Sequence, residues 1–166
     1  GGNSAKLIQT LIRRNSDFAN KDTINIVTKM LLDLAVNNTD NHLRNLRIIL
    51  NKQNKWELSP IYDVTFNPYN QQHTYNPGGL PLQDLYLNNP KLAKSMAIDL
   101  GVDINIIREQ IEKVKGVANN WEMFCDKNNM TNNDKSLIAN SINLGLNRKN
   151  YDIQNKTKIS PIGKIK

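Results

Sequence analysis

Side chains that could bind a metal ion and move protons cluster in two short segments of the sequence. Residues 37–45 read NNTDNHLRN, and residues 56–64 read WELSPIYDV. Asp40, Asn45 and Asp63 offer two carboxylates and an amide oxygen, which are the hard oxygen ligands that Mg²⁺ prefers. Because Mg²⁺ usually takes few protein ligands and keeps substrate phosphates and water as the rest, these three residues predict a magnesium site.

The residues between the two segments predict a β-hairpin that would bring them together. An apolar stretch, a polar turn and a second apolar stretch follow one another over residues 46–58, and a Ser-Pro pair ends the pattern. Because a tight hairpin returns the chain to its start, we expect Asp63 to lie near Asp40 and Asn45.

Helices are expected on the N-terminal side of the hairpin. Apolar residues at helical spacing predict a short helix over residues 4–14, with Ser4 as its cap. A second apolar pattern predicts a deeply buried helix that opens at Asp22 or Thr23 and runs through Ala35.

Helices are also expected on the C-terminal side. Pro90 can open one that ends at a Gly101 cap, and Asp103 can cap the next. Thr131 or Asn133 can cap a last helix. These elements together predict a mainly α fold with one small β-hairpin.

Composition limits the remaining possibilities. The chain has 166 residues, of which 39% are hydrophobic, so it suits one domain and is not globally disordered. No apolar run is long enough for a transmembrane helix, and the single Cys125 excludes an internal disulfide framework and a cysteine-based metal cluster. We therefore expect a protein of the reducing cytoplasm, away from the membrane. Residues 66–90 are rich in Pro, Gly, Asn and Gln and predict a long irregular loop, of the kind that often carries function.

Positive charge is concentrated at the C-terminus. The net charge is +7, and residues 148–166 hold six basic residues and one acid, which is +5 and leaves +2 for the rest. We expect residues 1–149 to form the domain and residues 150–166 to form a basic, partly flexible tail. A weak nucleic-acid contact of this tail is the alternative, because Lys and Arg neutralise phosphates.

The two motifs resemble a known family. DxHxxN at residues 40–45, a hydrophobic hairpin, and WxLSPxYD at residues 56–63 are similar to the HipA family of bacterial serine/threonine kinases. These kinases are the toxins of HipA–HipB toxin–antitoxin systems. The chain differs from ordinary protein kinases in two ways that this family shares: Asp63 is followed by Val64-Thr65 without glycine, and no His-Arg pair precedes Asp40.

The resemblance implies a role for each site residue. Asp40 would be the catalytic aspartate that accepts or orients the proton of the substrate hydroxyl, and Asn45 and Asp63 would hold the Mg²⁺ that binds with ATP. His42 would either donate a hydrogen bond to the transferred phosphate or brace the loop. Arg44 is expected on the surface.

The resemblance also implies a helical C-terminal kinase lobe that is incomplete alone. This sequence has no Gly-rich phosphate loop and no phosphate-binding lysine, which an N-terminal lobe supplies in the family. We therefore expect the isolated chain to be inactive or very weak. The implied partners are that N-terminal lobe, a HipB-like helix-turn-helix antitoxin through which DNA is reached indirectly, and a protein substrate such as an aminoacyl-tRNA synthetase.

Two other functions remain open from the sequence. A metal-dependent nuclease could use Asp40, His42 and Asp63 on a metal, with the basic tail on nucleic acid. Asn45 argues against it, because phosphotransfer from ATP commonly uses an amide at that spacing and a nuclease does not need one. The third possibility is a non-catalytic binding module that keeps the fold of a kinase lobe.

Overall fold

The computed structural model describes residues 3–42, 45–69 and 79–148. In that part of the chain the protein is mainly helical, with a single two-stranded antiparallel sheet, as the sequence predicts. The elements in chain order are α1 (Asn3–Asn15), α2 (Ala19–Ala35), β1 (Ile48–Leu50), β2 (Trp56–Leu58), the short 3-10 helix η3 (Leu82–Asp84), α3 (Leu92–Leu100), α4 (Ile104–Asn119), α5 (Trp121–Lys127) and α6 (Asn132–Asn147).

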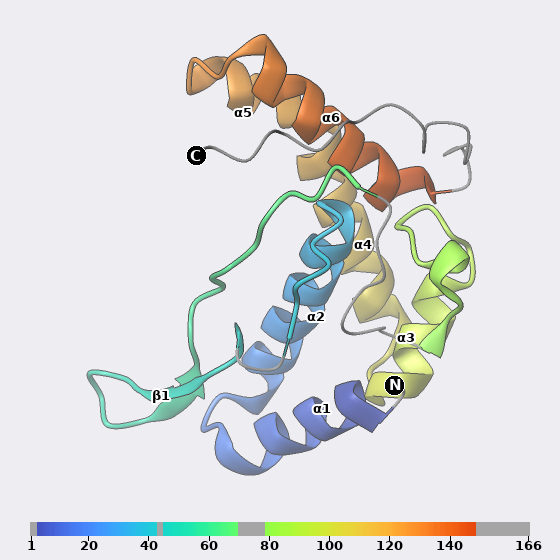
Figure 1. Cartoon of the computed structure of the whole chain (residues 1–166). Coiled ribbons are helices and arrows are strands. Elements are labelled where there is room, and N and C mark those ends of the chain that lie inside the picture. The colour runs from blue at the N-terminus through green and yellow to red at the C-terminus, as the bar shows by residue number, and fades with distance from the viewer. Residues whose placement is uncertain (1–2, 43–44, 70–78, 149–166) are drawn as a thin grey trace, which may run out of the picture.

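Helix α2 is the centre of the fold. It packs against α1, α4, α6 and the hairpin (Figure 1). The hairpin lies at the same end of the molecule as α1, and α5 lies at the opposite end (Figure 1). Within the described ranges, no helix combines the length and the apolar composition that a membrane crossing requires.

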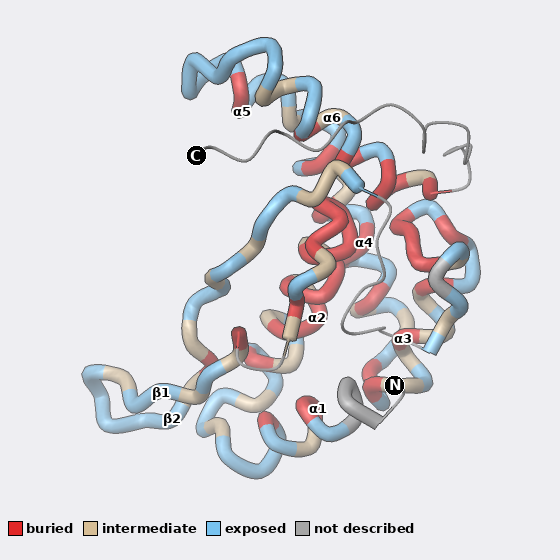
Figure 2. Tube along the Cα trace, viewed as in Figure 1, coloured by how far each residue is buried: buried red, intermediate tan, exposed pale blue. Residues whose placement is uncertain are grey.

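The core lies around α2, where buried residues concentrate (Figure 2). Val27 and Leu31 of α2 are fully buried, as their helical spacing predicts, whereas Ile24 is partly exposed. Ile26, which lies outside the predicted pattern, is also fully buried. The apolar stripe of α1 is only half covered: Ile8 and Ile12 are buried, while two neighbouring leucines are exposed.

On the C-terminal side two predicted helix ends are confirmed, but α3 begins at Leu92 and not at Pro90. On the N-terminal side both predicted helix starts are corrected. Gly101 adopts the left-handed conformation that ends α3, and Asp103 caps α4 by accepting from the amide of Asn105 at 2.7 Å. By contrast, Ser4 lies inside α1, and α2 begins at Ala19, before the predicted start at Asp22 or Thr23. The correction for α2 follows from Asp22, whose side chain serves the hairpin and does not cap the helix.

The hairpin forms where the sequence predicts it. Ile48 pairs with Leu58 and Leu50 with Trp56 in an antiparallel ladder. The side chain of Asn51 holds the turn, because its carbonyl oxygen accepts from the amides of two residues of the connecting loop. The chain therefore reverses between the two motif segments.

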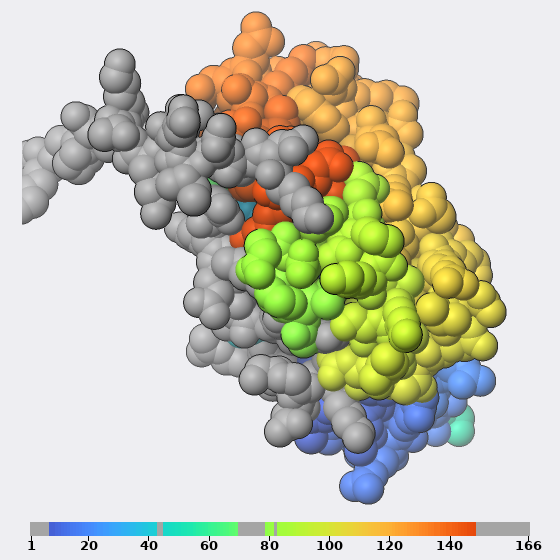
Figure 3. All heavy atoms as spheres, turned by 90° about the vertical axis from the view of Figure 1, so that its right-hand side faces the viewer, coloured from blue at the N-terminus to red at the C-terminus, as the bar shows by residue number. Residues whose placement is uncertain are grey.

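The segment expected as an irregular loop is only partly irregular where the structure describes it. Residues 70–78, which include His73, lie outside the described ranges. Beyond them, the short helix η3 is followed by Leu85 and Leu87, which are buried in the core, and the amide of Leu87 donates to the carbonyl of Gly145 at 2.9 Å. Figure 3 shows this segment and α3 between α1 at one end of that face and α5 and α6 at the other.

Candidate active site

The loop that carries Asp40 starts at a defined helix end. Helix α2 closes with Asn37 in the left-handed conformation at φ 52°, which asparagine tolerates better than most residues. The amide of Asn37 donates to the carbonyl of Leu34 at 3.0 Å, and the amide of Asn38 donates to the carbonyl of Asp33 at 2.7 Å. This is the hydrogen-bond pattern of a Schellman motif, and it fixes the direction in which the chain leaves the helix.

The side chain of Asn37 ties the loop to the segment beyond the second motif. Its amide donates to the carbonyl of Asn67 at 2.7 Å and to that of Tyr69 at 2.9 Å. The amide of Asn67 in turn donates to the hydroxyl of Thr39 at 2.6 Å. The residues just before Asp40 are therefore joined to residues just after Asp63.

Asn38 is the residue that connects the two segments directly. Its side-chain amide donates to the carbonyl oxygen of Asp63 at 3.2 Å. Its carbonyl oxygen accepts from the backbone amide of Asp40 and from the hydroxyl of Thr65, both at 3.2 Å. The backbones at Asp40 and Asp63 therefore lie against one buried side chain, although the two residues are 23 positions apart in the sequence.

Asp40 is exposed to solvent, whereas Asn45 is buried. The side chain of Asp40 is 80% exposed, so its carboxylate is open to solvent. Asn45 is buried, and its amide nitrogen donates to the carbonyl of Asp40 at 3.3 Å. Because the nitrogen of Asn45 is engaged in this way, its carbonyl oxygen is the atom that could bind a cation.

Asp63 occupies a conformation that few side chains favour. Its φ is 57°, in the left-handed region, and its side chain is exposed. Backbone strain of this kind concentrates at functional sites, where the surrounding structure holds it in place. Here the hydrogen bond from Asn38 to the Asp63 carbonyl is part of that support.

His42 lies beside Asp40. Its Nε2 is 3.9 Å from a carboxylate oxygen of Asp40, which is too far for a hydrogen bond but close enough for an electrostatic interaction if the ring is charged. Its Nδ1 is buried and has no hydrogen-bond partner among the described residues. Residues 43–44, including Arg44, lie outside the described ranges.

A buried ion pair lies directly beneath the loop. Lys29 Nζ is 2.7 Å from the Asp33 carboxylate, and both side chains belong to α2. Burial raises the pKa of Asp33 above its ordinary value, the hydrogen bonds from Lys29 and Asn38 oppose this increase, and the charge of Asp63 adds to it. The negative charge of Asp63 thus contributes to the raised pKa of Asp33.

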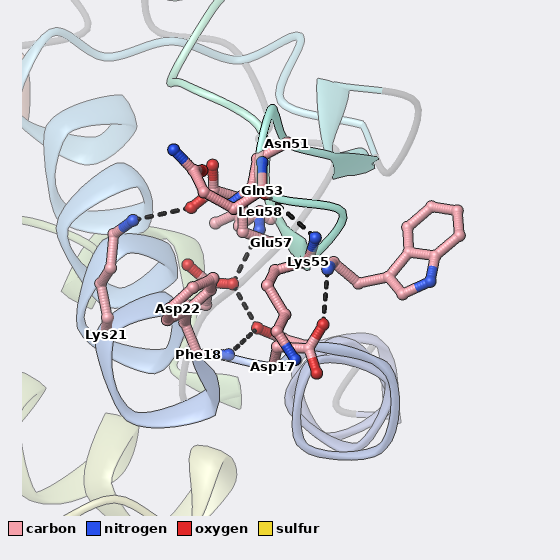
Figure 4. Close-up of polar contacts among 11 residues, drawn as sticks. Asp17, Phe18, Lys21, Asp22, Asn51, Gln53, Lys55, Glu57 and Leu58 are labelled. Atoms are coloured by element: carbon pink, nitrogen blue, oxygen red, sulfur yellow. Dashed lines mark hydrogen bonds and ion pairs between the residues drawn. The ribbon is translucent and has the colours of Figure 1, made fainter.

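The hairpin is held in place by acidic residues near the start of α2 (Figure 4). Asp22 is fully buried, and one of its carboxylate oxygens accepts from the backbone amide of Leu58 at 2.7 Å and from the hydroxyl of Ser16. Asp17 accepts from the amide of Trp56 at 2.6 Å and donates its own amide to the Trp56 carbonyl at 2.8 Å. These contacts fix β2, from which the chain runs directly to Asp63.

A surface ion pair lies beside the same contacts. Lys21 Nζ is 2.9 Å from a carboxylate oxygen of Glu57, and Figure 4 shows Lys21 reaching from α2 toward β2. The hydrogen bond to Glu57 raises the pKa of Lys21, and the same bond lowers the pKa of Glu57. Because the pair is exposed, water and salt screen it, and Asp22 and Asp17 remain the main anchors of the hairpin.

The donor set suits Mg²⁺ bound together with phosphate. Within the described residues no group of three or more His, Cys, Asp or Glu side chains is placed to enclose a metal ion. A magnesium ion that keeps water and phosphate oxygens needs only one or two carboxylates from the protein. Asp63 and the carbonyl oxygen of Asn45 are the residues of this site that could supply such ligands.

Sequence reasoning missed four residues that organise the site. Asn37 and Asn38 were expected only as loop residues, and Lys29 and Asp33 were not singled out. The available signal was the Lys-Asp pair at i and i+4 inside an otherwise apolar helical stripe, since charged residues are rarely buried without a specific partner.

The comparison with protein-family models gives one match. The model described as the HipA-like C-terminal domain matches residues 2–121, which include both motif segments and the helices from α1 to α4. No curated protein and no solved structure matches the chain at a significant level.

Proposed function

Because this chain belongs to the family of HipA-like C-terminal domains, we propose that it is the catalytic lobe of an ATP-dependent serine/threonine protein kinase. The observation that carries the proposal is the position of Asn38, whose one side chain contacts the backbones of both Asp40 and Asp63. That contact supports the proposal that the residues of the two motifs act in one site.

The proposal gives each side chain a separate task. Asp40, which is exposed, accepts or orients the proton of the substrate hydroxyl as that oxygen attacks the phosphate. Asn45 and Asp63 would hold Mg²⁺, which when bound neutralises charge on the phosphates of ATP. His42, whose Nε2 lies 3.9 Å from the Asp40 carboxylate, would either donate a hydrogen bond to the transferred phosphate or brace the loop.

The proposed activity needs parts that these residues do not supply. A kinase also requires a phosphate-binding loop and a lysine for the nucleotide, and neither motif is present in this sequence. We propose that a nucleotide-binding lobe provides them, and that the working enzyme is cytoplasmic. A helix-turn-helix antitoxin and a protein substrate, such as an aminoacyl-tRNA synthetase, complete the proposed set of partners.

The test is phosphotransfer from ATP labelled at the γ-phosphate, measured with this domain joined to its nucleotide-binding lobe. We expect Mg²⁺-dependent labelling of protein that Asp40→Asn abolishes. Asp126→Asn, in the distant helix α5, should leave labelling intact and serves as the matched control. Labelling that survives Asp40→Asn would overturn the assigned role of this residue.

Other outcomes distinguish the alternatives. Cleavage of nucleic acid without ATP, lost in Asp63→Ala, would favour the metal-dependent nuclease. Binding of a partner protein or DNA, with neither labelling nor metal-dependent nucleotide binding, would favour the non-catalytic module.

A further inference from the structure

The Lys29–Asp33 pair is an unusual feature of α2, whose other buried residues, apart from Asp22, are apolar. The side chains are 5% and 3% exposed, so both charges have lost nearly all of their hydration. A buried ion pair seldom stabilises a fold more than a well-packed apolar pair would, because removing two charges from water is costly. Its presence in α2 therefore calls for a reason other than stability.

The contacts of Asp33 indicate what that reason is. One carboxylate oxygen accepts from Lys29 at 2.7 Å, and the other accepts from the side-chain amide of Asn38 at 2.9 Å. The same amide nitrogen donates to the carbonyl of Asp63. Lys29 thus holds Asp33 in one orientation, and Asp33 holds the Asn38 amide in the plane that reaches Asp63.

The other end of the Asn38 amide points to the catalytic loop. Once the nitrogen is fixed toward Asp33 and Asp63, the carbonyl oxygen must face the amide of Asp40 and the hydroxyl of Thr65, and it accepts from both. A rotated amide would present N–H groups to these two donors and lose both bonds. The orientation of one amide therefore sets the backbone at Asp40 and Asp63 together.

We propose that Lys29 and Asp33 form a positioning pair that aligns the catalytic and metal-binding segments through Asn38. The inference rests on the proposed function, because it assigns the pair to the alignment of that site. Neither residue touches substrate or metal, so the pair acts through another side chain.

A small cavity provides a second link between the pair and the catalytic loop. Lys29, Asp33, Asn41 and His42 are among the residues that line it, and its volume of about 10 Å³ is close to the room that one water molecule needs. Asn41 Oδ1 and His42 Nδ1 are both buried without a partner among the described residues. One water molecule bound here would bridge these atoms to the ion pair and fix the ring of His42.

Two double variants separate positioning from stability. Lys29→Met with Asp33→Asn removes both charges but keeps a side-chain carbonyl oxygen that can accept from Asn38. Lys29→Met with Asp33→Leu removes the charges and the acceptor. Both should fold, because the ion pair is replaced as a whole and no single charge is left buried.

Two readouts follow, with Mn²⁺ as the probe for the metal site. The Asp40 amide proton should exchange with solvent as slowly in the Met/Asn variant as in the wild type, and at least about tenfold faster in the Met/Leu variant. Mn²⁺ affinity should follow the same order, with a loss of about 10- to 100-fold in the Met/Leu variant, as for other residues that orient metal ligands. Equal exchange and equal affinity in the two variants would overturn the proposal.

The design also keeps the two levels of inference apart. If the wild-type chain binds no Mn²⁺ at these residues, the proposed function fails, while the exchange of the Asp40 amide still tests the alignment. A high-resolution crystal structure tests the second link: electron density for a water molecule between Asn41 and His42 is expected, and a dry cavity would overturn that link.

Discussion

Gly145 of α6 lies directly against the backbone carbonyl of Ala35 at the end of α2. A Cβ atom at position 145 would overlap the carbonyl oxygens of Leu34 and Ala35. Four residues earlier, the hydroxyl of Ser141 donates to the carbonyl of Val36. Helix α6 lies beyond residue 121, where the family match ends, and it packs against the helix end from which the loop with Asp40 departs.

Substitution of Gly145 by alanine should therefore destabilise the protein. The added methyl group meets backbone atoms that cannot move aside independently, and overpacking of this kind typically costs about 1–3 kcal/mol. Gly116→Ala is the matched control, because nothing lies within 4 Å of the position of its Cβ. It should not destabilise the protein, since alanine is more favourable than glycine inside a helix by about 1 kcal/mol. Urea unfolding measures both, and a Gly145→Ala variant as stable as the wild type would contradict this close approach.

Replacing Asp63 with glycine should preserve the stability of the fold but weaken metal binding. Because its backbone is left-handed, Asp63→Gly should be at least as stable as the wild type, whereas Asp63→Ala should lose about 1 kcal/mol. Both variants lack the carboxylate, so both should bind Mn²⁺ more weakly than the wild type does. Thermal unfolding and Mn²⁺ titration on the same samples test this pair, and an alanine variant more stable than the glycine variant would be inconsistent with the strained backbone.

The hairpin should depend on Asp22 more than on the surface ion pair. Asp22→Ala leaves the Leu58 amide without its acceptor in a buried position, at a cost of about 1–3 kcal/mol, and should speed hydrogen exchange of that amide. Lys21→Met removes the exposed pair with Glu57 and the cation–π contact with Phe18, and it should leave exchange of the Leu58 amide unchanged. Equal effects of the two substitutions would show that Asp22 is not the anchor.

The buried carboxylate of Asp33 predicts a specific pH dependence. Because its folded-state pKa is raised above the ordinary value of 3.8, the folded protein binds this proton more tightly than the unfolded chain does. The stability that this proton contributes is therefore fully present below pH 3.8 and is lost as the pH rises through the folded-state pKa.

Comparison with the Lys29→Met, Asp33→Asn variant isolates this effect, since the other titrating groups are shared. We expect the free energy of unfolding of the wild type, relative to that variant, to decrease as the pH rises from 3.8 through the folded-state pKa. Urea unfolding over a series of pH values measures the difference. A relative stability that increases with pH would show that the ion pair with Lys29 outweighs burial.

What the sequence predicts well in this protein is local. The hairpin follows from its alternating apolar and polar stretches, and the caps at Gly101 and Asp103 follow from residue type and position. The motif spacing also places Asp40 and Asp63 on the two sides of that hairpin.

The parts that sequence reasoning missed depend on tertiary neighbours. Nothing in the sequence distinguishes Asn38 from the other asparagines expected in loops. Only the folded chain shows that its side chain contacts the backbones of Asp40 and Asp63. Aspartate is a common helix-capping residue, yet the carboxylate of Asp22 accepts a hydrogen bond from the amide of Leu58 in β2 instead of capping the helix. Asp33 and Lys29 have the spacing of an ordinary surface ion pair, and their burial is decided by what packs around α2.

The central claim is that Asp63 and Asn45 form a metal site next to Asp40. The most direct test is titration of the ¹⁵N-labelled chain with Mn²⁺, whose unpaired electrons broaden the amide signals of nearby residues. We predict broadening centred on Asp40, Asn45 and Asp63 that Asp63→Asn removes and Asp126→Asn does not. Broadening centred elsewhere, or broadening that persists in Asp63→Asn, would contradict the account.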